Sequence, residues 1–259
     1  MRLRASLLLP ATALAAFAAG QLTLAPQDRD ALGAPSQVVL AAAPTAPAAA
    51  PKPVKRPRGP RPHRLAVVRA GVALASRPGG PGAIRLGTRT EFGSRRVLAV
   101  AAQRGDWLGL VTPQRPNNRL AWVKRRHRSL TIRRTRFSLH ADLSARTLTL
   151  RRGGRRVHRL RVAIGRPGSP TPTGRFAVTD KLAGARFGSY YGCCILALNG
   201  HQPNLPPGWT GGNRLAIHGT SSPATIGAAA SAGCLRAGDA DLRVLMAKVP
   251  LGTPVFIRA

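Results

Sequence analysis

The chain has 259 residues and a formal net charge of +33, from 41 Lys and Arg against 8 Asp and Glu. This charge does not by itself indicate a nucleic-acid-binding protein, because the arginines are spread along the chain among apolar residues and do not gather in one helix or arm. We therefore predict no specific nucleic-acid partner, although anionic polymers would be attracted at low ionic strength. Three cysteines are too few for a disulfide framework, and no Cys and His spacing resembles a zinc site, so we predict no metal and no other cofactor.

Residues 1–20 have the pattern of a secretory signal peptide. Arg2 and Arg4 form a positive start, an uncharged run rich in Ala and Leu continues to Ala19, and Gly20 adds a small residue suited to cleavage. Charged residues begin again at Asp28, which leaves no room for a full membrane span. We predict an exported protein, and the alternative is an uncleaved signal that anchors the chain in the membrane.

Residues 21–63 are predicted to be a disordered linker. Ala and Pro dominate this stretch, and Lys and Arg are added towards its end. Such a composition cannot bury enough apolar surface to pack, and proline keeps the backbone extended.

From 64 to 128 the pattern changes to short apolar segments separated by Gly, Pro and Asn. The segments 65–68, 97–100 and 107–111 are predicted to be strands. This arrangement resembles a small bacterial SH3-like β-barrel. Both a ligand-binding role and a purely structural role are open for it.

Residues 130–259 are predicted to be mostly strand. Apolar segments at 176–178, 194–198 and 215–217 support this, as does the alternation of Leu, Val and Ile around 160–164. One helix is predicted after Asp239, a plausible N-cap, and it ends before Pro250; its apolar positions are Leu242, Leu245, Met246 and Val249. The sequence therefore predicts a mainly β domain with one or two short helices.

A candidate site for thiol chemistry follows the strand at 215–217. Cys234 stands after Gly233, where the backbone can approach a substrate closely, and His218 ends an apolar strand. A thiol that transfers acyl groups needs a base within reach and hydrogen-bond donors for the developing oxyanion. Arg236 lies two residues after the thiol, so in an extended strand it would share its face and lower its pKa or bind a carboxylate.

These residues together resemble the signature of the L,D-transpeptidase (YkuD-type) catalytic domain. The signature is a His-Gly pair followed by Ser-x-Gly-Cys-x-Arg, here His218-Gly219 and then 231–236. An upstream element of the family is also present at 165–166 and 171–176. The resemblance covers about 135–258 and implies a YkuD-like β-sandwich or barrel over 130–259.

The resemblance also implies roles for individual residues. Cys234 would attack a peptide carbonyl after a meso-diaminopimelate-type residue of a tetrapeptide stem and expel the terminal D-Ala. His218 would take the thiol proton and later activate the incoming amine, with the carbonyl of Gly219 holding the imidazole tautomer. The amides of Gly233 and Cys234 would form the oxyanion hole, and Ser231 and Arg236 would shape the loop and contact the stem.

Neighbouring residues add three further expectations. Tyr190 or Tyr191 could lend a phenol to the oxyanion, and the insert 192–212 lies where a lid is expected. Ala232 stands where many family members have His, which leaves the acceptor contacts open. Cys193 and Cys194 are predicted to be core residues of a strand; a vicinal disulfide, or a bond to Cys234 that would silence the enzyme, is the alternative.

The predicted function is that of an exported, monomeric L,D-transpeptidase of the cell wall or periplasmic space. It would bind peptidoglycan stems as donor and acceptor, form 3-3 cross-links and also be attracted to anionic wall polymers. Two alternatives are open: an L,D-carboxypeptidase with the same acyl-enzyme, and a non-catalytic basic wall-binding protein.

Overall fold

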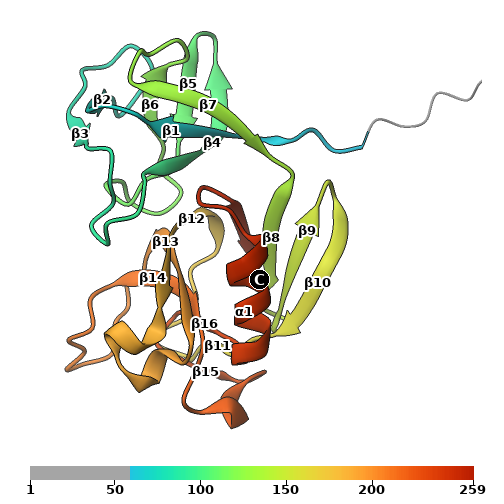
Figure 1. Ribbon diagram of the computed structural model, residues 1–259. Coiled ribbons are helices and arrows are strands. Elements are labelled where there is room, and N and C mark those ends of the chain that lie inside the picture. Colours follow the sequence, from blue (N-terminus) through green and yellow to red (C-terminus); the bar gives the residue numbers. More distant parts are fainter. Residues whose placement is uncertain (1–58) are drawn as a thin grey trace, which may run out of the picture. The chain divides into compact units, whose positions relative to one another are not determined.

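The computed structural model describes residues 59–259, so the predicted signal peptide and the linker as far as residue 58 lie outside the described residues. Seventeen strands and one α-helix make up the described part (Figure 1). The strands are β1 (His63–Val68), β2 (Val72–Leu74), β3 (Ile84–Leu86), β4 (Val97–Arg104), β5 (Trp107–Leu110), β6 (Ala121–Lys124), β7 (Leu130–Thr135), β8 (Phe137–Asp142), β9 (Thr147–Arg152), β10 (Arg155–Arg161), β11 (Ile164–Gly165), β12 (Gly174–Ala183), β13 (Cys194–His201), β14 (Arg214–His218), β15 (Ala229–Ser231), β16 (Leu235–Arg236) and β17 (Pro254–Arg258). Among residues 59–259, no helix is long and apolar enough to cross a membrane.

The upstream region forms a five-stranded antiparallel sheet in the order β6-β5-β4-β1-β7, with β2 and β3 paired separately. The predicted strands at 65–68, 97–100 and 107–111 correspond to β1, β4 and β5. Alternating residues such as Leu74, Leu108 and Leu110 are fully buried in its own core. The sheet continues through β7 to Thr135, past the predicted boundary at 128–130. Its likeness to an SH3 barrel stays a prediction.

The downstream region forms an eight-stranded mixed sheet in the order β10-β9-β8-β17-β12-β13-β14-β16. Pairing is parallel between β8 and β17 and between β14 and β16, and antiparallel elsewhere. The predicted strands 176–178, 194–198 and 215–217 lie in β12, β13 and β14. The predicted mainly β class is therefore confirmed.

The helix α1 (Asp239–Lys248) packs against the core of this sheet through Leu242 and Leu245, which are fully buried (Figure 1). It ends before Pro250, as predicted, but its N-cap is Gly238, without a side-chain cap. Asp239 is thus the first helical residue and not the cap. Its carboxylate accepts hydrogen bonds from the backbone of Cys193 instead.

Three short 3₁₀ segments complete the described chain, at Gly184–Phe187, Ser189–Tyr191 and Pro223–Thr225. The second segment brings Tyr190 and Tyr191 to the end of β14, where both rings lie beside the ring of His218.

Candidate active site

The register of β14 against β16 places the motif residues together. Ile217 pairs with Leu235 and His218 with Arg236, in parallel. Ile217 and Leu235 are fully buried in the main core. Because side chains alternate across a strand, His218, Arg236 and the preceding Cys234 project from the other face. There Cys234 packs on the small cluster that contains Ala216.

His218 is buried, with 1% of its surface exposed, and its ring is held by the residue that follows it. Nδ1 lies 2.6 Å from the carbonyl oxygen of Gly219. Because a carbonyl oxygen can only accept a hydrogen bond, Nδ1 carries the proton and Nε2 has a free lone pair. Burial lowers the pKa of His218 to about 4; the hydrogen bond to Gly219 opposes this and the cation of Arg236 adds to it. The imidazole is therefore neutral at pH 7 and can act as a base.

Cys234 is a free, half-buried cysteine. Its sulfur lies 3.9 Å from the carbonyl oxygen of Arg214 on β14. Burial raises the pKa of the thiol, against smaller lowering effects of the Ala216 backbone and Arg236. The expected lowering of the pKa by Arg236 is thus present but smaller than the effect of burial. No hydrogen bond joins the thiol to His218 within residues 59–259. The raised pKa of the thiol and the lowered pKa of the imidazole both favour the neutral forms at pH 7.

The loop before the nucleophile is fixed by the hydroxyl of Ser231. Ser231 Oγ accepts the amide of Gly233 at 3.0 Å and donates to the carbonyl of Cys234 at 2.6 Å. Gly233 has φ of +116°, and a Cβ there would lie 2.0 Å from Gln202 Nε2, so only glycine fits. The Gly233 amide donates to Ser231 in this structure, so its predicted oxyanion role stays a prediction, and the Cys234 amide is the other backbone candidate.

Gln202, which the sequence analysis did not single out, ties the segment after β13 to this loop. Its side chain is 3% exposed, and Nε2 lies 2.9–3.2 Å from the carbonyl oxygens of Ser169, Pro170 and Ala232. A buried amide with these partners holds three separate segments in register. The only indication of this contact in the sequence is the Pro-Thr element at 171–176, which directly follows Ser169 and Pro170, two of the partners of Gln202.

Arg236 and the two tyrosines lie beside His218. Arg236 is 8% exposed, donates from Nη2 to the hydroxyl of Tyr190, and stacks on that ring at 4.7 Å. Tyr191 packs edge-on against His218, with ring centroids 4.9 Å apart, and burial raises the pKa of its phenol. Arg236 therefore faces Tyr190 in this structure, and its predicted contact with a stem peptide stays a prediction.

The candidate site contains a small pocket of about 40 Å³. The segment 202–213 supplies much of its lining, which agrees with the expected position of a lid, and the space holds a few water molecules at most. The lining residues include Tyr190, Tyr191, Gln202, Leu205, Trp209, Asn213, Arg214, Ala216, His218, Ala232 and Cys234.

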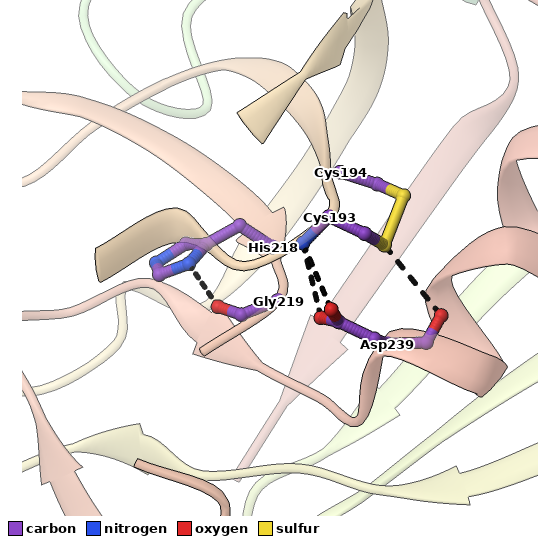
Figure 2. Close-up of a disulfide and its surroundings, with 5 residues drawn as sticks. All are labelled: Cys193, Cys194, His218, Gly219 and Asp239. Carbon is purple, nitrogen blue, oxygen red and sulfur yellow. Dashed lines mark hydrogen bonds between the residues drawn. A yellow bond between two sulfur atoms is a disulfide. The ribbon is translucent and has the colours of Figure 1, made fainter. Parts of the chain in front are cut away.

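Cys193 and Cys194 form a vicinal disulfide, so the alternative that the sequence left open is the one found (Figure 2). Cys194 is also a buried core residue, as predicted. The other alternative, a bond to Cys234, is wrong, because Cys234 is free. Cys194 packs in the main core, whereas Cys234 packs with Ile195 and Ala216 on the other face of the sheet.

Comparison with known proteins finds relatives of the downstream region. The model of the YkuD family, the L,D-transpeptidase catalytic domain, matches residues 136–257. The YkuD proteins of Bacillus subtilis (strain 168) and Bacillus licheniformis are each 32% identical over 123 residues, 47% of this chain and 65% of theirs. An L,D-transpeptidase structure from Mycobacterium smegmatis covers 64% of this chain and 92% of its own, at 15% identity and a TM-score of 0.41.

Proposed function

We propose, on the premise that residues 136–257 are an L,D-transpeptidase catalytic domain of the YkuD family of cysteine transpeptidases, that this chain joins peptidoglycan stem peptides outside the cell membrane. The match spans a little less than two thirds of the curated relatives, so the activity of the whole chain is proposed from its own residues. The observation that carries the proposal is His218, neutral, buried and held by Gly219 in the tautomer that a base needs, in the same cavity as Cys234.

The first half-reaction would transfer an acyl group to Cys234. As the sulfur attacks the carbonyl carbon that precedes the terminal D-Ala, His218 Nε2 takes the thiol proton. The tetrahedral oxyanion would be stabilised by the Cys234 amide, with Tyr191 as a second donor. When the intermediate collapses, the C–N bond breaks, the imidazolium returns its proton to the leaving amine, and D-Ala departs from a thioester.

The second half-reaction would use the side-chain amine of another stem. The amine attacks the thioester carbon, His218 accepts a proton from the attacking nitrogen, and the C–S bond breaks. The proton then returns to the sulfur, which restores the neutral pair and releases a 3-3 cross-linked product. Because the resting thiol and imidazole are both neutral, no stable thiolate waits in the free enzyme, and proton transfer accompanies attack.

A stem peptide is larger than a pocket of about 40 Å³, so we expect part of the segment 202–213 to move when the stem binds. Trp209 and Gly212 close this segment on itself through a bond of 2.6 Å from Nε1 to the carbonyl. Opening would move the part of the segment beyond Gln202, because the Gln202 amide is held by three carbonyls, and movement of a short segment of this kind is usual for active-site lids.

The test is mass spectrometry of the purified full chain incubated with a disaccharide-tetrapeptide, with and without an amine acceptor. A dimer that lacks one D-Ala, lost in Cys234→Ala, supports the transpeptidase. Free tripeptide in place of the dimer would indicate the carboxypeptidase, in which water resolves the thioester. Absence of both products would leave the non-catalytic wall-binding alternative.

A second proposed activity is binding of an anionic wall polymer, and it is supported by a basic concavity of about 490 Å³ on β8, β9, β10 and β17. Arg151, Arg156 and Arg159 line it without an acidic partner in the described residues, and its one acid, Asp142, is bound to Arg258 at 2.7 Å. Phosphodiester groups match such an array of guanidinium groups.

This binding can be measured with a synthetic poly(glycerol phosphate). Changing the three unpaired arginines of the concavity to Gln should weaken binding more than an equal loss of charge elsewhere. The matched control changes three exposed arginines of the upstream region, Arg85, Arg95 and Arg119. Equal loss in both variants would mean that only the net charge matters and would remove the site.

A further inference from the structure

Three segments that are distant in sequence meet behind His218 (Figure 2). They are the turn that enters β13 at Cys193, the residue Gly219 that follows β14, and Asp239 at the start of α1. None of the three lines the cavity, so none is expected to touch a substrate. Their contacts with one another lead to the ring of His218.

Three hydrogen-bonded contacts, linked by the backbone of Cys193 and Cys194, join Asp239 to the base. The amide of Cys193 donates to both carboxylate oxygens of Asp239 at 3.1 Å. The carbonyl of Cys194 accepts the amide of Gly219 at 3.0 Å. The carbonyl of Gly219 in turn accepts the Nδ1 proton of His218 at 2.6 Å.

The packing around the carboxylate is close enough to fix these positions. A Cβ on Gly219 would lie 2.3 Å from Asp239 Oδ1, and one on Gly192 would lie 2.5 Å from the same atom. The carboxylate thus fits against bare backbone on two sides. The disulfide adds a third restraint, because Cys193 Sγ lies 3.6 Å from the carbonyl oxygen of Asp239 and is covalently joined to Cys194.

Helix stabilisation alone does not account for this arrangement. An acidic residue in the first turn of a helix interacts favourably with the macrodipole wherever its side chain points. Asp241 occupies the same turn, and its carboxylate binds His158 at 2.7 Å on another side of the helix. Asp239 and Asp241 therefore have the same favourable position relative to the helix dipole, but their carboxylates bind different partners.

We infer that Asp239 and the Cys193–Cys194 disulfide are a positioning element for His218, and that its function depends on the oxidised state of the disulfide. A dithiol reductant would supply two electrons and two protons, giving two free thiols and its own disulfide. The turn at Cys193 would then lose its covalent restraint, and the carbonyl of Cys194 would no longer be held in place. Gly219 would lose the hydrogen-bond partner that orients its own carbonyl towards Nδ1 of His218. The inference rests on the proposed function only in taking His218 as the base of Cys234.

The first test compares Asp239→Ala, the rescue variant Asp239→Asn, and the control Asp241→Ala in the full chain. The readouts are kcat and KM of transpeptidation and the pH dependence of Cys234 alkylation by iodoacetamide, followed at that peptide by mass spectrometry. We expect Asp239→Ala to lose about tenfold or more in kcat with little change in KM, and to need a higher pH for alkylation. Asn keeps an acceptor for the Cys193 amide, so it should restore most of the rate, and the control should stay within about twofold.

The second test concerns the disulfide itself and does not require Asp239→Ala to fold. Wild type is reduced, freed of reductant without oxygen, and compared with the oxidised protein and with the double variant Cys193→Ser/Cys194→Ser. Reduction should slow Cys234 alkylation in wild type, and the double variant should be slow in both conditions. Alkylation needs no peptidoglycan, so a failure of the proposed reaction would not be confused with a failure of this inference.

Two results would overturn the inference. One is an unchanged Cys234 profile in wild type whose Cys193 and Cys194 are shown by mass to be free thiols. The other is an equal loss of kcat in Asp239→Ala and Asp241→Ala, which would mean that Asp239 only stabilises the start of the helix.

Discussion

Acidification should destabilise this protein through His218, and the size of the effect can be worked out from the structure. The pKa of His218 in the folded protein is about 4 because the ring is buried, whereas the ordinary pKa of histidine is 6.5. Between pH 6.5 and pH 4, the unfolded chain therefore binds a proton at His218 and the folded chain does not. The contribution of His218 to stability is complete above pH 6.5 and is lost as the pH falls towards 4. A difference of about 2.5 pKa units corresponds to about 3 kcal/mol.

The assay is urea unfolding of wild type and His218→Gln at pH 7, 5.5 and 4. Gln has a similar reach but does not titrate, so the difference in unfolding free energy between the two proteins isolates His218. Between pH 7 and 4 that difference should shift by about 3 kcal/mol against wild type. The pKa of Asp142 is lowered to about 2, so the loss due to its protonation falls mainly below pH 4 and outside this window. Parallel curves for the two proteins down to pH 4 would refute the reasoning, because they would mean that the buried ring accepts a proton without cost.

Three further predictions follow from the site. Cys234→Ala should abolish turnover while the unfolding midpoint stays within a few degrees, and residual turnover measured by mass spectrometry would exclude Cys234 as the nucleophile. Gly233→Ala should lower both activity and stability, by about 1–3 kcal/mol in urea unfolding, because φ of +116° is strained for Ala and its Cβ would meet Gln202; wild-type behaviour would show that the loop relaxes freely. Gln202→Ala should cost about 1–3 kcal/mol and reduce kcat, since three carbonyls lose their donor; a loss of stability without any loss of kcat would limit Gln202 to a structural role.

The parts of the site that could be predicted from the sequence are those carried by local patterns. The apolar alternation located β12, β13 and β14, and the order of His218, Gly219 and Cys234 indicated the chemistry before any geometry was known. The bond from the Gly233 amide to Ser231 is also local, since a serine hydroxyl often binds an amide two residues further on. That bond can therefore be predicted from the sequence.

The parts that could not be predicted depend on single polar residues that meet across long sequence separations. Asp239 binds an amide 46 residues away, and the amide of Gln202 reaches carbonyls 30 to 33 residues away. Such contacts leave no periodic pattern, so each residue looks like an ordinary helix-start or loop residue. Adjacent cysteines likewise do not reveal whether they are bonded, because pairing depends on the backbone between them.

The remaining prediction concerns how the nucleophile is protected. Cys234 lies in a cavity of about 40 Å³ behind a segment to which Trp209 belongs, and burial raises the pKa of its thiol. A thiol that is partly buried and protonated reacts slowly with small electrophiles and oxidants, because access is limited and the thiolate is the reactive form. Substrate binding would therefore expose Cys234 in the same step in which its thiol proton is transferred to His218.

Trp209→Ala tests this protection directly. Removal of the indole opens the cavity to solvent, so the alkylation of Cys234 by iodoacetamide at pH 7 should become several-fold faster. Trp107→Ala is the control, since Trp107 is partly exposed on β5 and does not line the cavity. If Trp209→Ala reacted no faster than wild type or this control, access would not limit the thiol, and the high pKa alone would have to keep it unreactive. In that case the rate should rise with pH equally in all three proteins, whereas protection by the lid requires the variants to differ at every pH.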